Sequence, residues 1–176
     1  MRFTLLLPLL AVAFLLNGCA GYHIGPIQPK FMAGMHKLAI PALKNNTLEP
    51  RIEVAVADAI IKQFQQDGTY QIVDSNDADA IIKGTIMDVR RRSARSIPGN
   101  VLQTLEYTLE LKVQFSVIKR STSEVIDTRT ISGNTSFFVS GTDTIASDVN
   151  TDERQAIPLA AEDLAVQYVS MISEGW

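Results

Sequence analysis

Residues 105–117 alternate strictly between apolar and polar side chains, and this is the strongest pattern in the chain. The apolar positions are Leu105, Tyr107, Leu109, Leu111, Val113, Phe115 and Val117. Successive side chains of a β-strand point to opposite faces, so a period of two predicts a long strand with one buried and one solvated face. The polar residues 121–123 predict a hairpin turn, and residues 124–140 predict the returning partner strand. The pattern therefore indicates a long antiparallel hairpin.

Two other segments have the spacing of amphipathic helices. A first helix is expected from about Pro50 to Asp67, with Gly68 as its stop. A second helix is expected from about Pro158 onward, and the polar residues 141–156 before it predict a loop. The apolar stripes of the two helices are Ile52, Ala55, Val56, Ala59, Ile60 and Phe64, and Ala161, Leu164, Ala165, Tyr168, Val169 and Ile172.

Three shorter segments, residues 38–41, 70–73 and 80–90, are expected to add strands to the hairpin. The order is then strand, helix, four strands and helix. An amphipathic sheet and two amphipathic helices bury the most apolar surface when both helices lie on the apolar face of the sheet. We therefore expect an α+β two-layer sandwich, with two helices packed on one face of a mixed four- to five-stranded sheet.

The N-terminal residues have the features of a bacterial lipoprotein signal. Arg2 precedes about twelve largely apolar residues, which is too short for a membrane span of roughly 20 residues but fits a secretory signal. Residues 16–19 (Leu-Asn-Gly-Cys) resemble the lipobox, whose cysteine is acylated after cleavage just before it. The alternative is a secretory signal followed by an unmodified thiol.

On the lipoprotein interpretation, residues 1–18 form a signal peptide that is removed. Cys19 then carries the lipid, and three acyl chains exceed what stable membrane anchoring requires. Residues 19–36, which contain Gly and Pro without periodicity, would form a lipidated tether to a single domain at residues 37–176. By the sorting pattern of such lipoproteins, Ala20 after the cysteine permits the outer membrane.

Composition narrows the class of protein further. The chain has 176 residues, and 16 basic against 19 acidic side chains give a net charge of −3. Its isoelectric point of about 5.4 argues against a generally basic nucleic-acid-binding protein. A single cysteine excludes a disulfide within the chain. The hydrophobic content of 46% argues against intrinsic disorder.

The sequence lacks the constellations that catalysis requires. A metal site needs three or four convergent ligands, and His23 and His36 are far from any cluster of Cys, Asp or Glu. The motifs of serine hydrolases, phosphate-binding loops and dinucleotide-binding turns are absent from the sequence. Asp77 and Asp79 fit a turn in which aspartate bonds to the backbone. We therefore expect a binding or assembly protein rather than an enzyme, with no cofactor besides the lipid on Cys19.

One cluster of charge stands out in this acidic chain. Arg90, Arg91, Arg92 and Arg95 are expected at the end of the 80–90 strand and the start of the following loop. Guanidinium groups match phosphate with two parallel hydrogen bonds, so the cluster is a candidate anion-binding site. The alternative is a solvated strand edge whose charges prevent aggregation.

Several short segments together resemble the LptE family of lipopolysaccharide-assembly lipoproteins, in a branch outside the proteobacterial model organisms. They are residues 19–23, residues 37–41 leading to Asn46, Thr47 and Pro50, residues 68–73, residues 78–84 and a closing helix toward Trp176. The resemblance implies two helices against a four-stranded sheet, and a lipid-anchored protein of the outer membrane. It also implies a plug in the lumen of the large β-barrel LptD, assisting barrel assembly and delivery of lipopolysaccharide.

On this resemblance, Arg90, Arg91, Arg92 and Arg95 are candidates for contact with lipopolysaccharide, and nucleic acid is not an expected partner. Another resemblance stays open, because residues 38–41, Asn46-Thr47 and the helix after them are also similar to lipoproteins of the curli-secretion pore and of penicillin-binding-protein activators. Those families imply a pore subunit or a regulator of cell-wall synthesis.

Overall fold

The computed structural model describes residues 28–97, 100–138 and 146–174, with side chains for 28–94, 106–138 and 153–174. The N-terminal signal, Cys19 and His23 lie outside these ranges. The elements are η1 (Lys30–Met32), β1 (Lys37–Ala39), β2 (Lys44–Asn45), α2 (Ile52–Asp67), β3 (Gln71–Ile72), β4 (Ala80–Ile97), β5 (Asn100–Lys119), β6 (Glu124–Phe138) and α3 (Ala146–Glu174).

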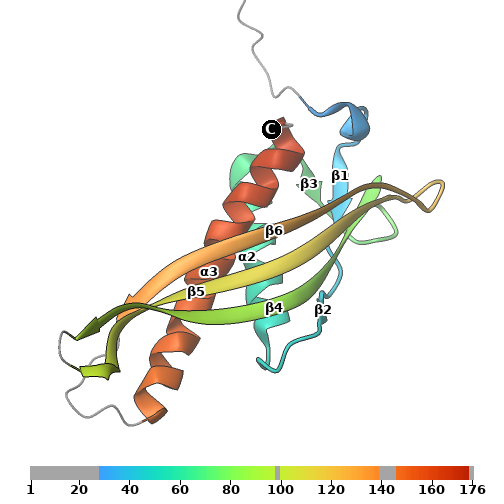
Figure 1. The fold of residues 1–176 in the computed structure, drawn as a ribbon. Coiled ribbons are helices and arrows are strands. Elements are labelled where there is room, and N and C mark those ends of the chain that lie inside the picture. Colours follow the sequence, from blue (N-terminus) through green and yellow to red (C-terminus); the bar gives the residue numbers. More distant parts are fainter. Residues whose placement is uncertain (1–27, 98–99, 139–145, 175–176) are drawn as a thin grey trace, which may run out of the picture.

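The sheet is mixed and has both helices on one face (Figure 1). Its strand order is β3-β1-β4-β5-β6, and β2 pairs with β4 beside this path. Strand β1 runs parallel to β3 and β4, and β2 runs parallel to β4, whereas β4, β5 and β6 are antiparallel. The predicted α+β two-layer sandwich is therefore confirmed, and the two-residue strand β2 is an addition that the hydrophobic pattern does not indicate.

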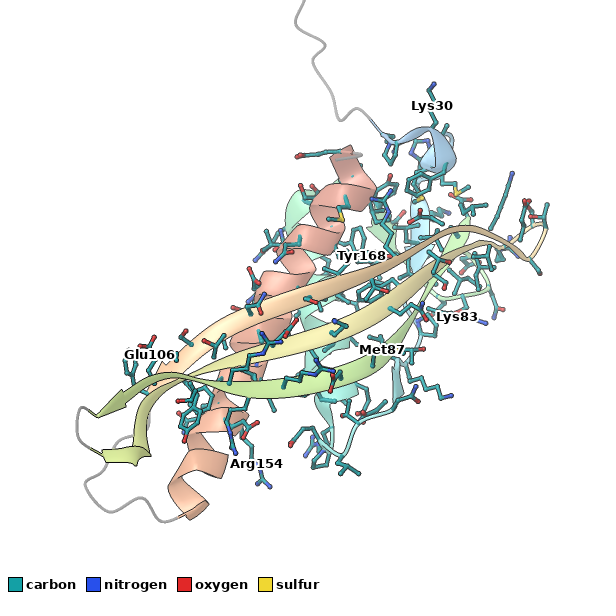
Figure 2. The ribbon with its side chains drawn as sticks, in the orientation of Figure 1. Lys30, Lys83, Met87, Glu106, Arg154 and Tyr168 are labelled. Carbon is teal, nitrogen blue, oxygen red and sulfur yellow. The ribbon has the colours of Figure 1, made fainter. Side chains whose placement is uncertain are left out.

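The alternation along β5 separates a core from a polar face, as predicted. Leu109, Leu111, Val113, Phe115 and Val117 are buried, and the residues between them lie on the outer face of the sheet. On the buried side, the rings of Phe115 and Tyr168 of α3 stack at a centroid distance of 4.0 Å. Figure 2 shows Tyr168 between the sheet and the helix layer.

The backbone of helix α3 lies directly against Gly133 of β6. A Cβ atom at this position would lie 2.1 Å from the carbonyl oxygen of Ala160, so a side chain here would force the helix away from the sheet. Next to it, the backbone N–H of Asn134 donates to Oδ2 of Asp163 at 2.8 Å. Strand β6 is the last strand in the order of the described sheet, so its outer edge has no partner strand there. The carboxylate of Asp163 on α3 accepts the N–H of Asn134 at this edge.

Asp79 joins the start of β1 to the start of β4. Its Oδ2 accepts the backbone N–H groups of His36 and Lys37, both at 2.9 Å, and these bonds hold the pKa of the carboxyl below its usual value. The predicted backbone-bonding role of this aspartate is confirmed.

The segment before β1 also packs against the domain. Met32 of η1 is fully buried, and the Phe31 ring lies 5.6 Å from the guanidinium carbon of Arg129 on β6. These residues belong to the predicted tether, 19–36, so its last part lies against the sandwich.

Three predicted boundaries are wrong, and one of them is the start of β5, which begins at Asn100 instead of residue 105. Strand β4 does not end near Arg90 but continues to Ile97. Helix α3 begins at Ala146, so the loop predicted for 141–156 is incorrect from residue 146 onward, while 141–145 lie outside the described residues. Pro158 lies within α3 and is exposed to solvent. The buried residues Ala156 and Ile157 continue the apolar stripe on its N-terminal side.

Within the described ranges, no helix has both the length and the apolar character for a bilayer span.

Two buried tyrosines differ in how their hydroxyl groups are satisfied. The hydroxyl of Tyr70 donates to the carbonyl oxygen of Ile172 at 3.0 Å, and burial raises its pKa to about 12. Among the described residues, the hydroxyl of Tyr168 has no hydrogen-bond partner, and burial raises its pKa still further.

This difference predicts opposite effects of removing the two hydroxyl groups. Tyr70→Phe leaves a buried carbonyl without its donor and should lower the free energy of unfolding by about 1 kcal/mol. Tyr168→Phe removes a polar atom that is buried without a partner, so the free energy of unfolding should stay constant or rise. Urea denaturation of both variants measures the difference, and an equal loss in both would contradict it.

Candidate functional site

A β-bulge at Met87 determines the direction of the arginines of β4. Ile86 lies opposite Val113 of β5, whereas Asp88 lies opposite the next residue of β5, Lys112. Met87 is therefore the extra residue, and it shifts the alternation of the side chains from Asp88 to Ser93 by one position; the register shifts again after Ser93. Figure 2 labels Met87 on this strand.

Arg90 and Arg92 lie on the polar outer face of the sheet. They are opposite Glu110 and Thr108 in register, which alternate with the buried residues of β5. Arg90 Nε lies 2.5 Å from Oδ2 of Asp88, and Arg92 Nη2 lies 3.3 Å from Oε2 of Glu110. The two arginine side chains are nevertheless 59% and 67% exposed. Such ion pairs typically contribute only about 0–1 kcal/mol, so an external anion can replace the carboxylates.

Arg91 points to the opposite face, toward the helices. Its Nη1 donates to Oε2 of Glu153 on α3 at 2.8 Å, and this carboxylate side chain is only 14% exposed. The guanidinium carbon also lies 5.3 Å from the ring centroid of Tyr107, which stacks on Phe137 at 5.6 Å. Arg91 therefore ties β4 to α3 and to the aromatic side chains of β5 and β6.

The three predicted site residues whose side chains are described are thus divided between two faces. Arg90 and Arg92 share the outer face, and Arg91 lies on the inner one. Arg95 lies opposite Glu106 in the backbone register of β4 and β5, and its side chain is outside the described set. The prediction that the cluster begins a loop is wrong, because all four residues belong to β4.

Among the described residues of β4 and β5, the outer face also carries Lys83 and Lys112, which the sequence analysis did not single out. Lys83 lies opposite Ser116, and Lys112 lies opposite Asp88, both nearer the other end of the hairpin. The position of Lys112 on the polar face could have been predicted from the alternation along β5. Within the part of the chain that the structure describes, no group of three His, Cys, Asp or Glu residues could hold a metal ion.

The model of the family described as "LptE: Lipopolysaccharide-assembly" matches residues 35–172. The chain belongs to the LptE family. The match spans all of the strands and nearly the whole of both helices, and it confirms the family resemblance of the short sequence segments. No curated protein matches the chain significantly.

Solved structures share the fold of this LptE-family chain at low sequence identity. A Xanthomonas campestris protein is 11% identical with a TM-score of 0.54, covering 85% of this chain and 90% of its own. A minor lipoprotein from Acinetobacter baumannii is 21% identical with a TM-score of 0.50, covering 79% and 93%. A PelC dodecamer from Paraburkholderia phytofirmans is 14% identical with a TM-score of 0.50, covering 80% and 89%. These similarities concern the fold alone.

The two faces predict different stabilities for arginine variants. Arg91→Ala should lower the free energy of unfolding by about 1–2 kcal/mol, because it removes a charge-assisted hydrogen bond and leaves Glu153 largely buried without its cation. Arg92→Ala should change it by less than about 0.5 kcal/mol, as expected for an exposed pair. Urea denaturation of both variants measures this, and equal losses would contradict the assignment of faces.

Proposed function

We propose that this chain is an outer-membrane lipoprotein that acts as the plug and assembly partner of an LptD-like β-barrel in lipopolysaccharide transport to the outer leaflet. The observation that carries the proposal is the LptE family match over residues 35–172. The protein acts by binding rather than by catalysis. Its ligand is lipopolysaccharide, and its membrane attachment is the lipid on Cys19.

The position of Cys19 supports an anchor close to the domain. The described chain begins at Gln28, nine residues after Cys19 in the sequence. An extended chain spans at most about 3.6 Å per residue, so Gln28 lies within about 32 Å of the anchor. This reach holds the sandwich near the membrane in which a barrel partner would be embedded.

The outer face of the hairpin supports contact with a hydrophilic barrel wall. Its residues on β5 and β6 are polar at consecutive register positions, including Glu110 opposite Asn134 and Gln114 opposite Thr130. A polar face of this kind forms hydrogen bonds and water bridges rather than a dry apolar contact. The exposed guanidinium groups of Arg90 and Arg92 on the same face supply donors for phosphates.

Affinity purification tests the barrel partnership. The tagged full-length chain should copurify from detergent-solubilised membranes with one much larger β-barrel protein at a one-to-one ratio. The matched control is an unrelated tagged outer-membrane lipoprotein of similar abundance. A ring of identical subunits, or copurification of a cell-wall synthase, would instead support the pore-like or activator-like lipoproteins.

Binding of lipopolysaccharide tests the role of the outward arginines. The double variant Arg90→Gln/Arg92→Gln should weaken binding at least about tenfold at low salt, and the salt dependence of affinity should become smaller. Fluorescent lipopolysaccharide titrated against the lipoprotein in phosphatidylcholine nanodiscs measures this. The control Lys83→Gln/Lys112→Gln removes the same charge from the same face. An equal loss of lipopolysaccharide affinity in both double variants would indicate a general effect of charge rather than a specific site at Arg90 and Arg92.

A further inference from the structure

A groove lies where the end of β6 meets α3. Its walls are Phe137, Phe138, Gln155, Ala156 and Leu159, and its volume is about 250 Å³. Phe138 is 64% exposed and Leu159 is 53% exposed, although both are large apolar side chains. Exposed apolar side chains from two elements that line one groove indicate a binding surface rather than single surface residues. We call these five residues the Phe138 groove.

The Phe138 groove lies at the same end of the hairpin as the arginines. On the inner side, its Phe137 ring stacks on Tyr107, which in turn lies under the guanidinium group of Arg91. On the outer face, Phe138 lies opposite Glu106, which is opposite Arg95 in the backbone register of the sheet. Apolar and cationic groups thus occupy neighbouring positions at the same end of the hairpin.

Strand spacing gives the distance between the two parts. Ser136 of β6 and Arg92 of β4 both lie opposite Thr108, so they are two strand spacings apart, roughly 9.5 Å. Phe138 is two residues farther along its strand, roughly 6.6 Å. The backbone at Arg92 and that at Phe138 are therefore separated by about 12 Å. One lipid molecule, with phosphates next to its acyl chains, can reach both.

We propose that the Phe138 groove binds an acyl chain of the lipopolysaccharide whose phosphates contact Arg90 and Arg92. The proposal rests on the proposed function, and it adds that an acyl chain is the part of the lipopolysaccharide that enters the groove. Charge complementarity favours a phosphorylated lipid as the occupant, because the groove lies near the exposed guanidinium groups of Arg90 and Arg92, which match phosphate. The acyl chain covers Phe138 and Leu159, and the phosphates displace Asp88 and Glu110 from the two arginines.

Photo-crosslinking in cells tests the location of the acyl chain. p-Benzoylphenylalanine is placed in the full-length chain at Phe138 or at Leu159, at Thr108 beside Arg92, or at Val166, which is 51% exposed on α3 outside the groove. Crosslinks to lipopolysaccharide are expected at the first three positions and not at Val166. Since all four side chains are at least partly exposed, the replacements leave the core intact.

The outcomes separate this proposal from the function on which it rests. A lipopolysaccharide crosslink at Thr108 but not in the groove would overturn the acyl-chain proposal and leave the proposed function standing. Crosslinks from the groove only to a protein, or to residues of this chain, would overturn it as well. An absence of lipopolysaccharide crosslinks at every position would count against both.

A binding measurement provides a second test in the nanodisc assay. For the unmodified chain, removal of the ester-linked acyl chains from lipopolysaccharide should weaken binding about tenfold, as expected when about two methylene groups lose their burial. For Phe138→Ser/Leu159→Ser, intact and deacylated lipopolysaccharide should bind within about twofold of each other. An equal effect of deacylation on both proteins would overturn the proposal.

Discussion

The extra residue at Met87 sets the direction of every described side chain in the second half of β4. If the same residues formed a regular strand without the bulge, Asp88, Arg90 and Arg92 would share the face of Ile86, which the helices cover. Three charged side chains would then be forced into the core, where each ion carries a desolvation penalty of several kcal/mol. The bulge instead places them in solvent and leaves only Arg91 facing inward, where α3 supplies a carboxylate.

Helix α3 connects the core of the sandwich to the arginine end. In its C-terminal half, Tyr168 stacks on Phe115, and near its middle Gly133 of β6 permits close approach of the helix backbone. The N-terminal half of the same helix carries Glu153, which binds Arg91. Since the position of α3 is fixed by close packing along the strand, the carboxylate is held where it meets the guanidinium group. The position of the Arg91 guanidinium group therefore depends on helix packing elsewhere along the sheet.

The alternation along β5 and the stripes of the two helices sufficed to predict the class of fold, because both patterns report directly which face is buried. The bulge could not be predicted in this way. Met87 is compatible with either face, and the arginines after it do not indicate where the alternation changes. The extent of β4 was missed for a related reason, since the residues that continue it are charged. Pro158 misled the prediction of α3, because on a solvent-facing position proline leaves the buried stripe uninterrupted.

The ion pairs of Arg90 and Arg92 affect which anions the outer face of the sheet can bind. Each arginine already has a carboxylate neighbour, so the face carries little excess charge and attracts a distant anion weakly. A ligand with one negative charge exchanges one ion pair for another and gains little. A ligand with two or more phosphates gains bidentate bonds to both guanidinium groups, and these bonds strengthen where a surrounding protein excludes water. An apolar contact beside the phosphates adds favourable binding free energy, which simple polyanions cannot gain. On the proposed function, a surface with charges balanced in this way would select phosphorylated lipids over simple anions.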